Sequence, residues 1–308
     1  MAPSERSADD LILPFQVADT AVRGRIVRLG GAIDEILSAH QFPDPVSELL
    51  GEAVALVSMM GASLKFDGKL IFQAQGDGPA PLLVTDYSAN GALRGTAKTS
   101  AELPDAISNP GLRELLGEGT IVMTIDQGAD MDRYQGVTPI EGDSLAQAAI
   151  SYFNQSEQIP TIIKLAVGRV QSPGAEPTWR AGGVMAQYVP GEGGTRERGE
   201  AILQTDEDRE HWDRAAAFVE TVQADELLDP FISAETLLYR LFHEDGVRVY
   251  DPQPVRAACS CNADKIGAVL SRYGKDDLED MVEDGAIIVT CEFCRKSYRF
   301  TPDGAHLE

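Results

Sequence analysis

The chain has 308 residues and a formal net charge of -23, because 49 acidic side chains outnumber 26 basic ones. A surface of this sign repels phosphate backbones and anionic lipids, so we expect neither nucleic acid nor a membrane as partner. Hydrophobic residues make up 43% of the chain, yet no stretch approaches the ~20 apolar residues that span a bilayer, and the polar start is unlike a secretory signal. We therefore expect a soluble cytosolic protein with two or more folded units.

The first part of the chain, residues 12–190, has the pattern of one α+β unit. A strand over 64–75 alternates apolar and polar residues and is followed by a Gly76-Asp77-Gly78 turn, which predicts a hairpin. Few long crossover helices separate the strands, so we predict a mostly antiparallel sheet with packed helices. The other predicted strands are 22–29, 82–86, 120–126 and 161–169, and the predicted helices are 33–40, 46–60 and 144–155.

The middle part, residues 191–254, is predicted to be a helical linker. It begins with a glycine-rich stretch up to Gly199, which lacks the Gly-Lys-Ser/Thr of a phosphate loop. A charged helix follows over 206–223, and an amphipathic helix lies over 234–242 with Ser233 as its N-cap. The first helix has only a narrow apolar stripe, so its docking should be marginal; an ordinary connector helix is the alternative. The stripe consists of Trp212, Ala215, Ala216, Val219 and Val222.

The last part, residues 255–308, is predicted to be a separate small module. One helix face contains Ile266, Val269, Leu270 and Tyr273 before Gly274, and a second short helix contains Leu278, Met281 and Val282 before Gly285. Strands are predicted at 286–290 and 297–300. A module of this size does not build a sufficient core alone, so a crosslink is expected.

All four cysteines of the chain lie in this module, as a Cys259-x-Cys261 pair and a Cys291-x-x-Cys294 pair. In a reducing cytosol such a cluster indicates metal binding or redox chemistry rather than permanent disulfides. Structural zinc takes four ligands in a tetrahedron, commonly thiolates. We therefore predict one Zn²⁺ per chain held by all four cysteines, and we interpret nearby His306 as a solvated residue rather than a ligand.

A purely structural zinc ribbon is the simplest interpretation, and three features favour a switch instead. Flanking cations favour the thiolate that oxidants attack. Each cysteine pair is close enough in sequence to form its own disulfide, with a tiny loop and little entropic stabilisation. Zinc contributes ~10–16 kcal/mol of folding free energy in small peptides, so oxidising its ligands should melt the module. The cations are Arg256, Lys265, Arg295, Lys296 and Arg299.

At these residues the chain resembles the heat shock protein 33 family of redox-regulated chaperones. The tail carries the most specific match, Cys259-Ser-Cys261 and Cys291-Glu-Phe-Cys294 followed by Tyr298 and Phe300. The body matches in the family's order at residues 63–68, 75–79, 93–95, 134–137 and 152–160. The resemblance covers nearly the whole chain.

The resemblance implies a holdase that uses no ATP and is not an enzyme. The reduced, zinc-bound form would be inactive. Oxidation would form Cys259–Cys261 and Cys291–Cys294 disulfides, release zinc and unfold the module and linker. The apolar surface exposed in this way would bind unfolding client proteins, and the active form would be a homodimer in the bacterial cytoplasm.

Two other functions are compatible with the cysteine pattern. The first is a thiol–disulfide oxidoreductase using Cys291-x-x-Cys294, although such motifs normally begin a helix. The second is a nucleic-acid-binding zinc ribbon, which the net charge disfavours. Among the polar body residues we expect no catalysis, only a network beneath the linker or capping and turn roles; these residues are Gln135, Ser156, Glu157 and Gln158. Gly76, Gly78 and Gly136 are predicted to be turn or close-approach positions.

Overall fold

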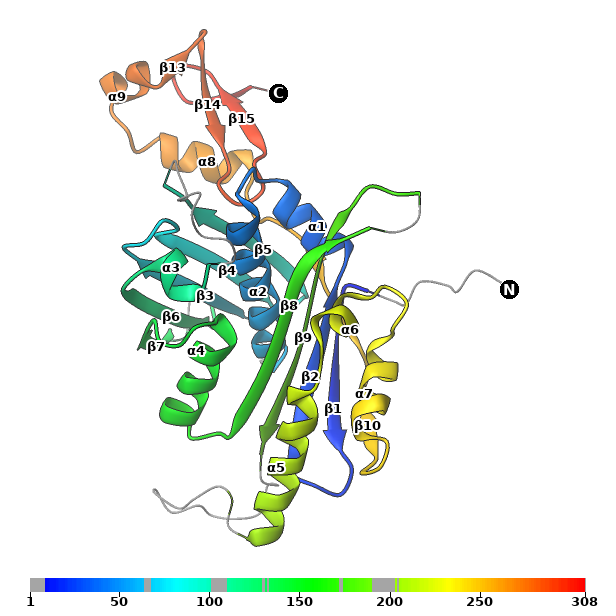
Figure 1. Ribbon diagram of the computed structural model, residues 1–308. Helices are drawn as coiled ribbons and strands as arrows, with labels where there is room; N and C mark the ends of the chain where they lie inside the picture. The colour runs from blue at the N-terminus through cyan, green and yellow to red at the C-terminus, as the bar shows by residue number, and fades with distance from the viewer. Residues whose placement is uncertain are drawn as a thin grey trace. The chain divides into compact units, whose positions relative to one another are not determined.

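The computed structural model describes residues 9–63, 68–100, 110–128, 131, 133–171, 174–189, 203 and 205–307. The chain divides into two compact units, residues 1–257 and 258–308 (Figure 1). The glycine-rich stretch 191–199 and most of the 63–68 motif lie outside the described residues. The predicted division into a core at 12–190, a linker at 191–254 and a module at 255–308 stays a prediction.

The first unit contains a sheet, here called sheet A, in which every strand pairing is antiparallel. Its strand order is β10-β1-β2-β9-β8, and β11 also pairs with β1. The strands are β1 (Leu11–Val17), β2 (Val22–Leu29), β8 (Thr161–Val170), β9 (Thr178–Tyr188), β10 (Val247–Val249) and β11 (Gln253–Pro254).

A second sheet of the same unit, sheet B, has the order β12-β5-β4-β3-β6-β7. Only the short β12 runs parallel to its neighbour, β5. The strands are β3 (Lys69–Gly76), β4 (Leu82–Ser88), β5 (Ala92–Lys98), β6 (Gly119–Asp126), β7 (Tyr134–Pro139) and β12 (Arg256–Ala257). The predicted α+β class with mostly antiparallel strands is confirmed, and the strands form two sheets rather than one.

The main hydrophobic core lies around the apolar helix α2 (Asp44–Gly61). Leu50, Val54 and Leu56 of this helix are fully buried and pack in one cluster with residues of both sheets. The other helices of this core are α1 (Gly31–Ser38), α3 (Leu112–Leu116) and α4 (Leu145–Tyr152), which continues as the π-helical turn η1 (Phe153–Glu157). None of the helices described is long and apolar enough to cross a membrane.

The opposite face of sheet A is covered by three helices, here called the linker helices: α5 (Asp206–Glu220), α6 (Ala224–Leu228) and α7 (Ala234–Phe242) (Figure 1). Ser233 caps α7 as predicted, accepting a hydrogen bond from the backbone N–H of Thr236. The ring centroids of Phe242 and Phe15 lie 5.7 Å apart, and both rings are buried. Sheet A is therefore covered by apolar groups on both faces.

Two adjacent glycines of β9 allow this double coverage. A Cβ at Gly182 would lie 2.6 Å from the carbonyl oxygen of Leu227 in α6. A Cβ at Gly183, on the other face, would lie 2.9 Å from the Met59 side chain of α2. Both distances are too short for a side chain, so glycine is required where helices pack closely on each face of the strand.

A buried polar cluster, here called the arginine latch, fastens the end of α6 to sheet A. Arg28 is fully buried and donates hydrogen bonds to the carbonyls of Glu226, at 3.2 Å, and Asp229. Arg180 donates to the carbonyl of Leu228 at 2.7 Å and forms a bidentate pair with Asp9 at 2.7 and 2.8 Å. The carbonyls at a helix C-terminus carry partial negative charge, so they help to balance the two guanidinium groups.

The carboxyl group of Glu52 on α2 gives the first unit a pH-dependent stability. Burial, and then the neighbouring Glu48 carboxylate, raises the pKa of Glu52 from 4.5 to about 7. The folded chain therefore keeps this proton at pH values where the unfolded chain has lost it. The stabilisation is complete below about pH 4.5 and is lost as the pH rises to about 7.

We expect Glu52→Gln to remove this pH dependence. At pH 8 the variant should exceed the parent in free energy of unfolding by about 2–3 kcal/mol, and at pH 4.5 the difference should vanish. Urea unfolding followed by tryptophan fluorescence measures this, since both tryptophans, Trp179 and Trp212, lie in the first unit. The matched control is Glu35→Gln, at an exposed position of α1. An equal gain at both pH values would contradict the assignment.

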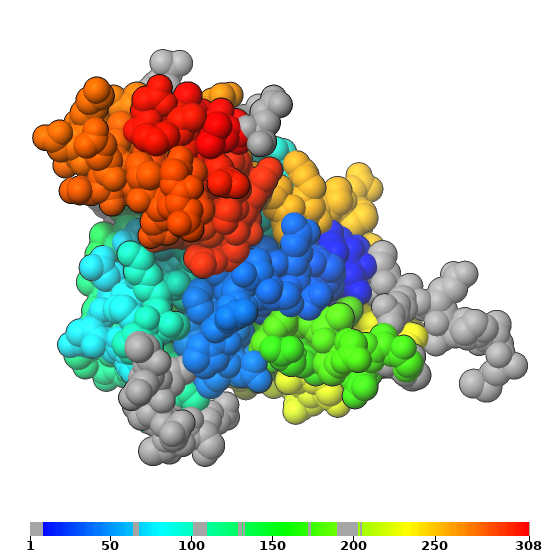
Figure 2. All heavy atoms as spheres, turned by 90° about the horizontal axis from the view of Figure 1, so that it is seen from above, coloured from blue at the N-terminus to red at the C-terminus, as the bar shows by residue number. Residues whose placement is uncertain are grey.

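The second unit, residues 258–308, has a small core of its own. In space-filling form it is the compact body coloured orange to red (Figure 2). The buried apolar residues of its core are Leu270, Leu278, Ile287, Tyr298 and Phe300. Its elements are α8 (Ala263–Leu270), α9 (Lys275–Asp280), β13 (Val282–Glu283), β14 (Ala286–Thr290), β15 (Ser297–Phe300) and β16 (His306–Leu307).

Two details of this unit differ from the sequence prediction. Gly285 does not end a helix; it lies in the tight turn of the β13–β14 hairpin, where Asp284 and Gly285 have φ of 49° and 80°. Val282 accordingly belongs to a strand. Val269 and Tyr273, predicted on the buried face of the first helix, are 52% and 47% exposed. The core therefore contains fewer apolar side chains than the helical pattern indicated.

Candidate metal centre

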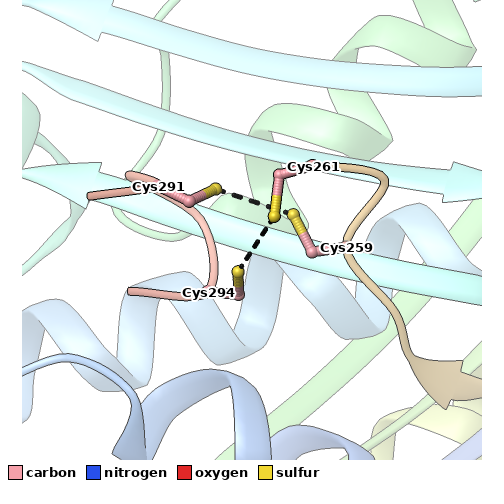
Figure 3. Close-up of side chains that lie close together, drawn as sticks. All are labelled: Cys259, Cys261, Cys291 and Cys294. Carbon is pink, nitrogen blue, oxygen red and sulfur yellow. Dashed lines mark hydrogen bonds between the residues drawn. The ribbon is translucent and has the colours of Figure 1, made fainter. Parts of the chain in front are cut away.

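The four cysteines come from two segments of the second unit. Cys259 and Cys261 lie between β12 and α8, and Cys291 and Cys294 lie in the connection between β14 and β15. All four are free and half-buried. Figure 3 shows their sulfur atoms pointing toward one another from the two segments. The structure therefore brings together every residue that the sequence predicted as a ligand.

The distances between the sulfur atoms fit a tetrahedral metal site. Cys259 Sγ lies 3.7 Å from Cys291 Sγ, and Cys261 Sγ lies 3.4 Å from Cys294 Sγ. All four sulfurs lie within 4.8 Å of one another. A zinc ion with four Zn–S bonds of about 2.3 Å has sulfur–sulfur edges of roughly 3.8 Å. Four thiols of this spacing form a suitable donor set for zinc.

Local hydrogen bonds shape both segments. Asn262 caps α8 by accepting from the backbone N–H of Lys265, whose ammonium group donates to the carbonyl of Ser260 at 2.6 Å. The turn after β14 is closed by hydrogen bonds from Cys291 N to Lys296 O and from Arg295 N to Cys291 O, each 2.9 Å. Arg295 has the left-handed φ of 57° that reverses the chain. Backbone geometry thus directs both cysteine pairs inward.

The hydroxyl group of Tyr298 is a neighbour of the cluster that the sequence analysis did not assign a role. It lies 3.2 Å from Cys261 Sγ and 3.3 Å from the Cys261 carbonyl oxygen. Tyr298 was identified only as part of the tail motif; its position four residues after Cys294, on a strand, was the available signal. A hydrogen bond of this kind orients a metal ligand and stabilises its thiolate.

The surroundings of the cluster shift the pKa values of three of its thiols in different directions. Burial raises the pKa of Cys261, but hydrogen bonds from Tyr298 and from the other thiols outweigh this effect and lower the pKa to about 7. Burial and the shared protons of the neighbouring thiols raise the pKa of Cys294 to about 12, and burial also raises the pKa of Cys259. The protons of these thiols are therefore shared within the cluster, and their titrations are coupled.

The role predicted for the flanking cations stays a prediction. The sequence analysis attributed thiolate stabilisation to five Lys and Arg side chains, whereas the structure attributes the lowered pKa of Cys261 to Tyr298 and the neighbouring thiols. The Lys265 ammonium is engaged by Ser260, and the Lys296 ammonium lies 5.2 Å from the centre of the Tyr298 ring.

The remaining predicted positions are also resolved. His306 is exposed, belongs to β16 and lies outside the sulfur cluster. Gln135 donates to Thr124 at 2.9 Å, and Gln158 ends η1 in a left-handed conformation, so it is a turn residue. Glu157 accepts a hydrogen bond from Tyr152 at 2.8 Å.

Comparisons with known proteins point to one family. The family model described as "Hsp33 protein" matches residues 10–301. The chain is 49% identical over 310 residues to the 33 kDa chaperonin of Caulobacter vibrioides, covering 99% of each chain. It is 37% identical to that of Azotobacter vinelandii, covering 94% of this chain and 91% of the relative. The crystal structure of the 33 kDa chaperonin of Thermotoga maritima shares the fold, with a TM-score of 0.77 and 96% of each chain covered at 21% identity.

Proposed function

The chain belongs to the Hsp33 family of chaperones, and from this premise we propose that it is a redox-regulated holdase whose switch is the four-cysteine cluster. The observation that carries the proposal is the convergence of four sulfurs, from two separate segments, within 4.8 Å of one another. The proposed ligands are Cys259, Cys261, Cys291 and Cys294, and the proposed metal is one Zn²⁺ per chain.

When bound, zinc would crosslink the two cysteine segments and contribute ~10–16 kcal/mol of folding free energy, as in zinc-finger peptides. The apolar side chains of the second unit would supply the rest of its stability, and few of them are buried. Five buried apolar side chains form the core of this unit. A unit with so small a core depends on its crosslink, so loss of the ligands should unfold it.

The proposed chemical step is the oxidation of each cysteine pair to a disulfide. Each pair of thiolates loses two electrons to an oxidant such as hydrogen peroxide, which is reduced to water, and one sulfur–sulfur bond forms. We propose the pairs Cys259–Cys261 and Cys291–Cys294. A disulfide sulfur is a poor metal ligand because the thiolate charge is gone, so oxidation removes the donor set.

The proposed output is exposure of an apolar surface for unfolding client proteins. The linker helices cover one face of sheet A through an apolar cluster that includes Phe15, Val184 and Phe242. If these helices detach after the second unit has unfolded, that face becomes available without ATP. We propose that the active protein is a cytoplasmic homodimer and that it performs no enzymatic reaction.

Aggregation of a heat-denaturing client enzyme tests the proposal. The reduced, zinc-loaded chain should leave aggregation unchanged, and the chain treated with hydrogen peroxide should suppress it and have lost its zinc. Dithiothreitol and zinc should restore the inactive form. Retention of zinc together with flat activity after oxidation would refute the proposal.

The two alternatives predict different results. In the oxidoreductase alternative Cys291-x-x-Cys294 would begin a helix, whereas here it connects two strands, which favours a metal-binding turn. Turnover of a small disulfide substrate would support that alternative. A zinc ribbon that binds nucleic acid would give a salt-dependent gel shift.

A further inference from the structure

The first unit contains a cavity of about 660 Å³ that the proposed function does not use. Two rows of paired strand residues contribute to its wall. In sheet A, Arg25 of β2 is paired with Met185 of β9. In sheet B, Leu70 of β3 is paired with Ile125 of β6. The cavity thus lies where residues of the two sheets approach one another, and its volume is typical of small-molecule sites, about 300–1,000 Å³.

The wall of the cavity is mainly apolar. It contains three methionines, and methionine side chains adapt to ligands of irregular shape. Phe153 and Ile159 extend this surface on the side of η1. The methionines are Met60, Met123 and Met185. A ligand that fills this space gains about 25 cal/mol for each Å² of apolar surface that it buries.

Arg25 places a positive charge on this apolar wall. Arg25 lies two residues before the buried Val27, and therefore on the same face of β2. The strand pattern would favour an apolar side chain at this position. Burial lowers the pKa of Arg25, yet a guanidinium stays protonated in proteins. Its Nε atom is buried and has no hydrogen-bond partner among the described residues. A guanidinium N–H that is withdrawn from water without an acceptor is costly, and Arg25 also lines the cavity, so an anion bound there would offset this cost.

The one carboxylate among the described residues of the cavity wall is engaged elsewhere. Glu157 accepts hydrogen bonds from Tyr152 at 2.8 Å and Tyr134 at 3.5 Å. Gly136 permits this arrangement, because a Cβ there would lie 2.8 Å from the Tyr152 hydroxyl oxygen. Within the part of the chain that is described, no ion pair joins Glu157 to Arg25. Arg23 on the rim adds a second cation, so the cavity carries a net positive charge.

We propose that this cavity binds a long-chain carboxylate, with its carboxylate on Arg25 and its hydrocarbon chain among the methionines. The net charge of -23 repels anions at long range and repels polyanions most. A ligand with a single charge and a large apolar body overcomes this repulsion through burial. The planar guanidinium matches a carboxylate in bidentate geometry. This proposal is independent of the redox switch.

Binding of a dansyl-labelled undecanoate to the reduced, zinc-loaded full-length chain tests the proposal. Fluorescence should rise to saturation at one probe per chain, and dodecanoate should displace the probe. Dodecanol, which has the same chain without the charge, should compete about 10- to 100-fold more weakly. Inorganic phosphate should not displace the probe. Equal competition by dodecanol and dodecanoate, displacement by phosphate, or the absence of saturable binding would overturn the proposal.

Variants of Arg25 distinguish an effect of the lost charge on binding from an effect on folding. Arg25→Met should weaken dodecanoate binding about 10- to 100-fold and leave dodecanol unaffected, whereas Arg25→Lys should keep most of the affinity. Because Arg25→Met removes a buried N–H that has no hydrogen-bond partner among the described residues, its melting temperature should not fall. The matched control is Arg113→Met, at an exposed arginine of α3 that pairs with Glu118. Unchanged dodecanoate affinity in Arg25→Met would refute the assignment.

Discussion

Replacing Cys291 by serine should abolish tight zinc binding and unfold the second unit while the two sheets of the first unit keep their fold. Serine removes one of the four sulfurs and with it most of the ~10–16 kcal/mol that such a site contributes in small peptides. The five buried apolar side chains of this unit cannot replace that contribution. Zinc content after dialysis and amide hydrogen exchange across residues 258–308 measure the two effects.

A matched control is available in the segment that contains the first cysteine pair. Ser260→Ala changes the residue between Cys259 and Cys261 and leaves all four sulfurs in place, so zinc content and exchange protection should persist. If the proposed switch is correct, the Cys291→Ser chain should also hold clients without oxidant, and dithiothreitol should not reverse this. One zinc per chain in the Cys291→Ser variant would contradict the ligand assignment.

The second large effect is expected from Arg28→Met in the arginine latch. The substitution leaves the carbonyls of Glu226 and Asp229 without their donor and removes one positive charge from the buried cluster. Breaking a buried polar cluster in this way typically costs about 3–5 kcal/mol. The loss should fall on the linker helices, because both carbonyls belong to the end of α6. Amide hydrogen exchange should therefore accelerate selectively across residues 206–242.

The control for this variant is Arg169→Met on β8. Arg169 is 51% exposed on its side chain and pairs with Asp44 at 3.3 Å, an ion pair of a kind worth about 0–1 kcal/mol. Its exchange pattern should match that of the parent. Arg28→Met should also show client holding under reducing conditions. Uniform destabilisation of the whole first unit, with no selective change in the linker helices, would contradict the role of the latch.

The elements that the sequence predicted well are those with regular periodicity and clear boundaries. The second strand was predicted at its observed limits of 22–29, and the strand over 161–169 and the helix at 234–242 also agree closely. The strand β9 was not predicted, because Gly182 and Gly183 lower the strand propensity of its sequence. The reason for these glycines is tertiary, the close approach of α6 and α2, and no local pattern reveals it.

The candidate site shows the same division between local and long-range information. Chemistry and spacing were enough to predict the four cysteines, because thiols in pairs have few other uses in a reducing cytosol. The contact of Tyr298 with Cys261 depends on how β15 packs beside the loop before α8.

The segment that contains the linker helices is joined at both ends to strands of sheet A, and in the proposed function this affects how clients are released. β9 ends at Tyr188 and β10 begins at Val247, and both strands belong to sheet A. Helices that detach from the sheet therefore stay tethered to it at both ends, with an effective local concentration in the millimolar range for short tethers. In the proposed function, a client on that face would compete with the linker helices, which are covalently attached to the sheet. If the proposed function is correct, restoring the affinity of the linker helices for the sheet would then be sufficient to displace the client.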